Sequence, residues 1–417
     1  MIVLDVELQL VSPLFLGGAD PTQSRLRGPA FKSALRGWYR AFDPEALKNE
    51  SRWFGGAGEE EGQAAFRLMV ESPRPLREET FSEDHTRPWR EGLTNGVQYL
   101  GYSLILRGNA GRRFFSPDQP ILLRLVVFES ERLGPAGWRA LLGAAWCLGN
   151  LGAIGARARR GFGSVQALGW SVRGEVPDGW AEDLLKLKHV SAVDRPADAL
   201  AAIRAAREQL RAWFPGTFPE GPRVHEHLGA KSRLALIPGV PRAPRDNLRW
   251  GVAFQAGGLA LQRFRAGYEP DRRRARDHVL WMNGRPDGRA LSGLAPDRVA
   301  FGLPLTFRFI KPEGLRPSSV ELNASGSTGG TGSGRNRVAP QPRQRHASPL
   351  RMRVLRIGKQ DFMLFLRMDG ALPGSTGVTV RGGQGAVGRD LGPPTGEVLD
   401  RFLDGLSGAH HLKAGAL

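Results

Sequence analysis

The order of strand-like and helix-like segments in the first 172 residues constrains the fold more than any other sequence feature. Residues 2–11 alternate apolar and polar side chains, which is typical of a strand with one buried face. Gly28-Pro29 begins a helical pattern, since proline is tolerated in a first helical turn. The pattern then predicts strands at 65–70, 121–128 and 165–172, and a helix at 137–151.

Strand–helix–strand, met twice in succession, is the order of a ferredoxin-like βαββαβ domain with insertions. A doubly wound fold is disfavoured because few helices alternate with strands. The chain has 417 residues, more than one hydrophobic core usually holds, so we expect two domains, 1–175 and 190–417. The predicted class is α+β, with 72–96 irregular and a boundary near 175–184. The second domain contains further predicted elements at 198–213, 305–310, 349–357, 362–368 and 397–406.

The charge balance points to a polyanionic partner. Lys and Arg total 59 against 41 Asp and Glu, a formal net charge of +18, and only eight of the 59 are lysines. Arginine presents a planar five-donor fork that suits phosphates and base stacking. A GC-rich genome would also enrich arginine, but it would not produce the excess of positive charge. The composition favours nucleic-acid binding.

The stretch GAIGARARRGFGSV, from Gly152 to Val165, combines four glycines with three arginines. A dinucleotide fingerprint lies between a strand and a following helix, whereas this loop follows a helix and precedes a strand. No Gly-Lys-Ser/Thr tripeptide is present, which disfavours a P-loop. Two interpretations remain: a tight connection with solvated arginines, or a phosphate contact. In the second, Gly155, Gly161 and Gly163 would permit close approach, and Arg157, Arg159 and Arg160 would supply donors.

Two other basic segments accompany this loop. Lys32, Arg36 and Arg40 recur every four residues along the first predicted helix, away from its apolar stripe of Phe31, Leu35, Trp38 and Phe42. The segment 323–345 is rich in Gly, Ser and Thr and then in Arg and Pro, so we expect it to be mobile. It is either an insertion without a role or a basic arm, with Arg335, Arg337, Arg343 and Arg345, that orders on a polyanion.

Metal and catalytic signals are sparse. His225-Glu226-His227 is the one compact trio of possible ligands, and solvated or core histidines are the favoured interpretation. His410-His411 fits a terminal tail. Asp20 and the Asp84-His85 pair are candidates for acid/base chemistry, and His85 and His278 are the residues to test for ribonuclease activity. We expect no metal and no cofactor.

The single cysteine, Cys147, lies in an apolar run and is expected to be a buried thiol. The opening MIVLDVELQLVSP fits a strand rather than a signal peptide, and no apolar run reaches the length of a bilayer span. These features predict a cytoplasmic protein.

The motifs SPLFLGGADP, LRGPAFKSALRGWYRA, WFGGAG and GAIGARARRGFGSV together resemble the RAMP superfamily of CRISPR effector proteins. Within it they are similar to the first-named Cmr subunits of type III-B complexes. FGLPLTFRF and RHASPLRMRV also resemble family elements. Ser33 stands where a glycine is common, and Gly37 where a bulkier residue is usual.

The resemblance implies two ferredoxin-like, RRM-related domains. It also implies a subunit that holds the 3′ part of the CRISPR RNA, helps engage target RNA and contacts other Cmr subunits, without a catalytic centre. The family's basic helix corresponds to Lys32, Arg36 and Arg40, and its glycine-rich loop to 152–164. The alternatives are a RAMP endoribonuclease that processes guide RNA precursor and a scaffold whose basic surface meets acidic proteins; related folds carry different activities.

Overall fold

The computed structural model describes most of the chain, and every structural statement refers to that part. The described residues are 1–18, 20, 23–56, 58, 62–92, 94–102, 104, 111–221, 225–266, 297–302, 305–308, 319–324, 347–372, 377–382, 389–392 and 397–412. Five predicted site residues lie outside these ranges: His278, Arg335, Arg337, Arg343 and Arg345.

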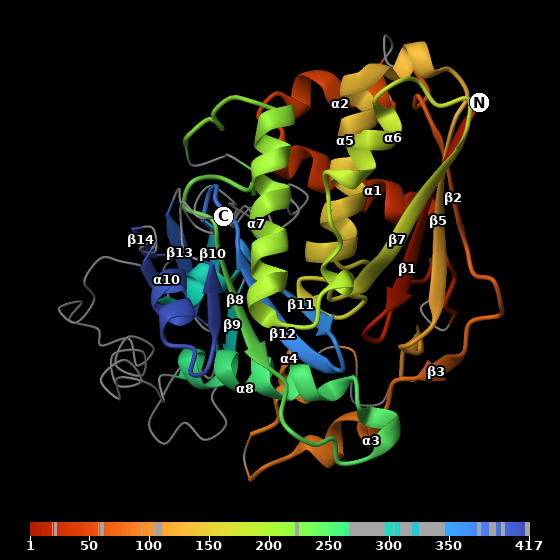
Figure 1. Cartoon of the computed structure of the whole chain (residues 1–417). Helices are drawn as coiled ribbons and strands as arrows, with labels where there is room; N and C mark the ends of the chain where they lie inside the picture. Colours follow the sequence, from red (N-terminus) through yellow and green to blue (C-terminus); the bar gives the residue numbers. More distant parts are fainter. Residues whose placement is uncertain are drawn as a thin grey trace, which may run out of the picture.

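The described helices and strands follow in chain order (Figure 1). They are β1 (Ile2–Leu10), α1 (Gly28–Phe42), α2 (Ala46–Phe54), β2 (Arg67–Glu71), β3 (Glu78–Thr80), α3 (Glu83–Thr86), η1 (Arg87–Trp89), α4 (Gly96–Leu100), β4 (Arg113–Phe115), β5 (Pro120–Val127), α5 (Ser130–Leu151), β6 (Arg160–Gly161), β7 (Val165–Gly174), α6 (Trp180–Leu185), η2 (Val190–Ala192), α7 (Pro196–Trp213), β8 (Arg233–Pro238), η3 (Asp246–Leu248), α8 (Gly251–Ala266), η4 (Asp297–Phe301), β9 (Leu305–Arg308), β10 (Ser319–Ala324), β11 (Leu350–Ile357), β12 (Gln360–Arg367), β13 (Val378–Gly382), β14 (Arg389–Leu391), α10 (Glu397–Asp404) and β15 (His410–Leu412).

The first sheet is antiparallel with strand order β2-β5-β1-β7. β1 is central: Leu4 lies opposite Leu125 of β5 and opposite Val172 of β7. The alternate apolar residues of β1 are buried, as the pattern predicts. α1 and α5 pack against one another and cover the sheet (Figure 1).

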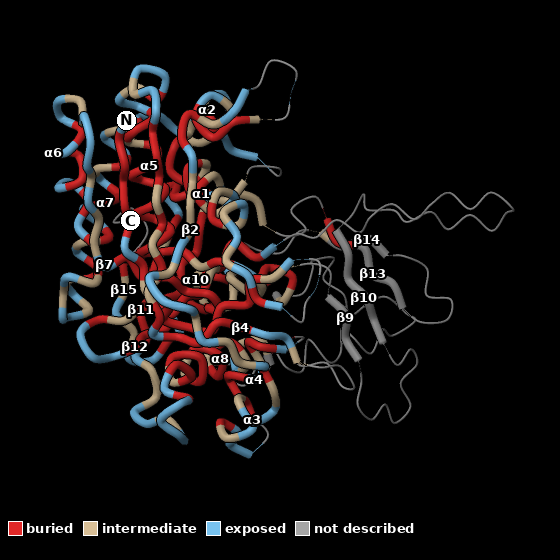
Figure 2. Tube along the Cα trace, turned by 90° about the vertical axis from the view of Figure 1, so that its right-hand side faces the viewer, coloured by how far each residue is buried: buried red, intermediate tan, exposed pale blue. Residues whose placement is uncertain are grey.

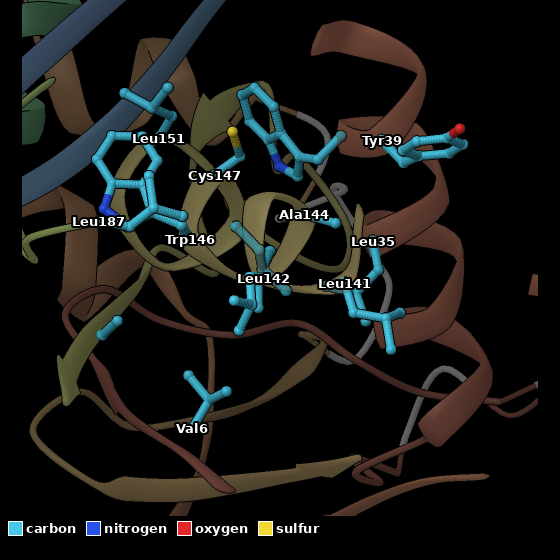
Figure 3. Packing of buried hydrophobic residues seen from close by; sticks show 14 of the residues in the cluster. Val6, Leu35, Tyr39, Leu141, Leu142, Ala144, Trp146, Cys147, Leu151 and Leu187 are labelled. Atoms are coloured by element: carbon cyan, nitrogen blue, oxygen red, sulfur yellow. The ribbon is translucent and has the colours of Figure 1, made fainter. Parts of the chain in front are cut away.

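The helix α5 is almost entirely buried over its second half, which explains its apolar composition. Leu141 lies beside Leu35 of α1, and Cys147 is part of the same cluster (Figure 3). Cys147 is a free, buried thiol as predicted, and burial raises its pKa. Among the described helices, none is long and apolar enough to cross a membrane.

The second sheet has strand order β15-β8-β12-β11-β6. Its strand β12 has a continuous apolar run, because each face of the strand packs against a different hydrophobic core. Phe362, Leu364 and Leu366 face the core that includes α5 and α7, while Met363 and Phe365 face the core that includes α8 and α10. A sheet covered on both faces loses the alternating pattern of a half-exposed strand. Figure 2 shows the buried trace continuing from α5 to α8.

Both cores draw residues from both halves of the chain. α7 stands between the two sheets in Figure 1, and its Ile203 and Leu210 share a cluster with residues of each sheet. The segment between β2 and β5 contributes Phe81, Trp89 and Phe114 to the core beneath α8. The prediction that 72–96 is irregular is wrong, because β3, α3 and η1 lie there. A remaining sheet has the order β14-β13-β10-β9.

Candidate nucleic-acid interface

The Gly/Arg loop, residues 152–164, joins α5 to β7 and packs against the strand-following segment at 11–16. The amide of Gly163 donates to the Pro13 carbonyl at 2.8 Å, and the amide of Ala156 donates to the Phe15 carbonyl at 2.9 Å. Its short strand β6 pairs in parallel with β11 of the second sheet. The loop therefore connects the two sheets, a position that the sequence pattern did not predict.

The glycines of the loop permit close approach to the protein's own backbone. Gly155, Gly161 and Gly163 all have positive φ angles, of 85°, 91° and 68°. A Cβ at Gly163 would lie 1.9 Å from the carbonyl oxygen of Ile154, and one at Gly155 would lie 2.4 Å from that of Phe15. These positions require glycine for internal reasons, independently of any ligand.

The loop amides are also used internally. The amides of Ala158, Arg160 and Gly161 donate to the carbonyls of Gly155, Arg157 and Ala158 at 3.4, 2.7 and 3.4 Å. Amides already paired in turns are not available as an anion nest. Contacts from this loop to a phosphate would therefore come from its side chains.

Arg159 shares one carboxylate with a second arginine. Its Nη1 donates to Glu226 Oε2 at 2.6 Å and to the Ser348 carbonyl at 2.9 Å. Arg351 Nη2 donates to the same Oε2 at 3.1 Å, and its guanidinium lies 4.8 Å from the centre of a Trp38 ring. Two cations on one carboxylate leave a positive charge uncompensated within this group.

Arg160 is largely buried and incompletely hydrogen-bonded. Its Nη2 donates to the Phe301 carbonyl at 3.4 Å, whereas its buried Nη1 has no partner among the described residues. Burial, together with the nearby charge of Arg265, lowers the pKa of Arg160 to about 10. Arg265 lies over the rings of Tyr99 and Phe301, at 5.9 and 5.7 Å from their centres. At neutral pH the Arg160 guanidinium carries charge, and an unpaired buried donor is a favourable place for an anion.

Arg157 connects the Gly/Arg loop to an exposed aromatic residue, Tyr102. Its Nη2 donates to the carbonyl of Tyr102 at 2.8 Å, and the Tyr102 residue is 77% exposed. Burial and the charge of Arg112 lower the pKa of Arg157. Sequence reasoning missed Tyr102, although Tyr99 and Tyr102 are two of only four tyrosines in the chain and lie only three positions apart.

The basic face of α1 lies against α2. Arg36 Nη2 lies 3.2 Å from Glu50 Oε1, and Arg40 Nε lies 2.5 Å from Glu50 Oε2. Burial opposes ionisation of Glu50, but hydrogen bonds and charge from the two arginines hold its pKa below the usual value. Lys32 lies over the Phe66 ring at 5.9 Å, and burial lowers its pKa. The described contacts do not join these three side chains to the loop arginines; a shared RNA surface stays a prediction.

The side chain of His85, a candidate for acid/base chemistry, stabilises the start of a helix. It completes the capping box at the start of α3 with Ser82, and its ring stacks on Phe81 with centroids 5.4 Å apart. Asp84 lies in the first turn of the same helix. Asp20 makes a backbone turn, its carbonyl accepting the amide of Gln23 at 3.4 Å.

The side chains of the candidate metal trio, His225 to His227, each bind other groups of the protein. His225 Nε2 hydrogen-bonds to the Arg40 carbonyl at 2.9 Å, and His227 Nδ1 to the His225 carbonyl at 2.9 Å. The Glu226 carboxylate binds arginines. Within the described ranges, no group of three His, Cys, Asp or Glu residues is placed to hold a metal ion. His410-His411 belongs to β15 at the sheet edge, so the expectation of a terminal tail is wrong.

Comparison with known proteins shows which superfamily part of the chain is similar to. The family model for the RAMP superfamily matches residues 7–166, which run from β1 into β7 and include the Gly/Arg loop. This match covers less than half of the chain, and over it the chain is similar to the RAMP superfamily, as its motifs predicted.

Within this class the chain is similar to Cmr1 proteins. The CRISPR system Cmr subunit Cmr1-1 of Pyrococcus furiosus is 29% identical over 153 residues, which cover 34% of this chain and 40% of that relative. The sequence match thus spans less than half of either protein. The mixed α/β fold is similar over the whole length of both chains to the apo crystal structure of Cmr1 from Pyrococcus furiosus, with a TM-score of 0.54 and 15% identity. A chain in the cryo-EM structure of the Type III-B Cmr-beta bound to cognate target RNA gives a TM-score of 0.51 and 14% identity, covering 97% and 99% of the two chains.

Proposed function

We propose that the chain is a non-catalytic RNA-binding subunit of a type III-B Cmr effector complex. In this role it holds the 3′ part of the CRISPR RNA, helps engage target RNA and contacts other Cmr subunits. The similarity to Cmr1 and to a chain of an RNA-bound Cmr complex supports the assignment to such a complex. A cytoplasmic location follows from the same proposal.

Two ferredoxin-like domains fit the strand orders of the two main sheets. The chain order β1-α1-β2-β5-α5-β7 gives the sheet order β2-β5-β1-β7, and β8-α8-β11-β12-α10-β15 gives β15-β8-β12-β11. In each case the first and third strands are central and the second and fourth lie at the ends, as in a βαββαβ unit. We propose the division 1–175 and 190–417 on this basis, with β6 of the first unit extending the sheet of the second.

One observation carries the RNA-binding proposal: the guanidinium groups near the loop outnumber their carboxylates. Arg159, Arg160, Arg265 and Arg351 are electrostatically coupled in pairs. The described ion pairs of these four residues involve only Glu226. Excess arginine beside an exposed tyrosine is the arrangement by which proteins hold single-stranded nucleic acid, through backbone charge and base stacking.

The test uses one exposed ring, Tyr102, and one loop arginine, Arg157. Tyr102→Ala removes an exposed ring, so we expect RNA binding to weaken by about 1–3 kcal/mol, the usual contribution of one stacked base. Because stacking is uncharged, the slope of log Kd against log salt should stay constant. Arg157→Gln should reduce that slope by about 0.7, the value for one phosphate contact on a single strand.

Arg204→Gln, on the exposed side of α7, is the matched control for the loss of one charge. Binding is measured by fluorescence anisotropy with a labelled single-stranded RNA at several salt concentrations. If both Tyr102→Ala and Arg157→Gln keep the RNA affinity and the salt slope of the unchanged protein, the loop is not part of the RNA interface.

A further inference from the structure

A cavity of about 440 Å³ lies between the C-terminal part of α7 and the residues 214–221 and 227–231. Small-molecule sites in proteins usually have volumes of about 300–1,000 Å³. None of its lining residues belongs to the Gly/Arg loop, so it is separate from the candidate RNA interface described above.

Aromatic rings form part of the cavity wall. Phe42, Phe214 and Phe218 line it, and the rings of Phe42 and Phe214 lie 5.4 Å apart. Phe218 stacks on His227 with centroids 4.1 Å apart and an interplanar angle of 18°. This pair presents a rigid flat surface, which is the kind of surface on which a planar heterocycle stacks.

A buried arginine supplies the polar part of the wall. Arg207 is 6% exposed, and its Nη2 donates to the Gly229 carbonyl at 2.8 Å. Its buried Nε has no partner among the described residues. Burial lowers the pKa of Arg207 to about 10, so the group is still charged at neutral pH. A charged, buried guanidinium with a spare donor is suited to an oxyanion.

The other charged groups of the wall favour an anion as well. Arg211 and Lys231 are exposed cations, and the carboxylates are Glu220 and Asp369. Asp369 Oδ2 accepts the amide of Lys231 at 3.1 Å, which occupies part of that carboxylate. Burial lowers the pKa of His227, so this ring is neutral at pH 7. The described wall therefore has more positive than negative charge.

We infer that this cavity binds one nucleotide unit, with its base against Phe218 and its phosphate near Arg207 and Arg211. A free nucleoside monophosphate and the phosphorylated end of an RNA chain share this chemistry. The inference goes beyond the proposed backbone contacts of the Gly/Arg loop, since it concerns a different surface and a single nucleotide.

The experiment is isothermal titration calorimetry on the full chain. The probes are AMP, CMP, GMP and UMP, inorganic phosphate, and tetranucleotide RNAs with and without a terminal phosphate at either end. We expect saturable binding of the monophosphates or of a phosphorylated tetranucleotide, and weaker binding of inorganic phosphate. Phe218→Ala and Arg211→Gln should each weaken binding by about tenfold, as expected for loss of a stacked base or a phosphate contact.

Arg204→Gln on the same helix is the control and should bind like the unchanged protein. Arg207→Gln tests the buried donor. If the Arg207→Gln protein does not fold, the Phe218→Ala and Arg211→Gln variants still test whether the cavity binds a nucleotide. Preference for monophosphates identifies a free nucleotide as the ligand, and preference for a phosphorylated tetranucleotide identifies an RNA end. Absence of saturable binding, equal binding of phosphate alone, or binding unaffected by Phe218→Ala and Arg211→Gln overturns the inference. Tyr102→Ala should leave nucleotide binding intact, which separates this test from that of the RNA interface.

Discussion

Glu226→Gln tests whether the Gly/Arg loop has a structural role in joining the two sheets. The carboxylate binds Arg159, which directly precedes β6, and Arg351 of β11, the strand that pairs in parallel with β6. Glutamine has nearly the same shape, but it removes the negative charge and one acceptor oxygen. The two guanidinium groups then face each other without their common counter-ion.

The expected loss follows from the two contacts. Arg351 is the more buried partner, and Glu226 is its acceptor among the described residues. A hydrogen bond to a charged group contributes about 1.5–3 kcal/mol. The Arg159 side chain is 39% exposed and keeps the Ser348 carbonyl, so its share is below about 1 kcal/mol. Together these give a destabilisation of about 3 kcal/mol, or roughly 3–6 °C in Tm for a chain of this size.

Thermal unfolding measures the global effect, with Glu175→Gln as an exposed control after β7. Hydrogen exchange measures the local effect. The amide of Met352 donates to the Arg159 carbonyl at 3.1 Å, and its exchange should become faster than that of amides in the first sheet. A Tm within about 1 °C of the unchanged protein, together with unaltered exchange at Met352, would refute the structural role of this carboxylate.

Two further predictions concern the fold. Gly163→Ala should destabilise the protein by more than about 3 kcal/mol, because the new Cβ meets the Ile154 carbonyl at a positive φ. Gly169→Ala, where a Cβ meets nothing within 4 Å, is the control in the same urea titration, and equal midpoints for the two variants would contradict the packing argument. Burial lowers the pKa of His189 to about 4. As the pH falls, this histidine therefore becomes protonated in the unfolded chain before it does so in the folded protein. The free energy of unfolding is at its full value above about pH 6.5 and decreases by up to about 3 kcal/mol as the pH falls towards 4. His189→Gln should flatten the stability profile in this window, and an unchanged profile would exclude His189 as its origin.

The first sheet and its helices could be predicted from sequence because each has one buried and one exposed face. The pattern of residues 2–11 became β1, and the pattern after Gly28 became α1. The prediction was weaker for the second sheet. β8 and α8 were missed, and both faces of this sheet are covered, so its strands do not alternate. The elements within 72–119 are three to five residues long, too short to show a period.

The loop shows which part of a site the sequence leaves undetermined. Glycine and arginine are visible in the sequence, but their partners are distant: Glu226 is 67 positions from Arg159, and Ser348 is 189. Only the fold reveals that Arg159 is committed to an ion pair. Side chains already engaged in the fold contribute charge to an interface but few free donors. For this reason the exposed Tyr102, which carries no charge, discriminates better between an RNA interface and a structural junction than the arginines that first suggested one.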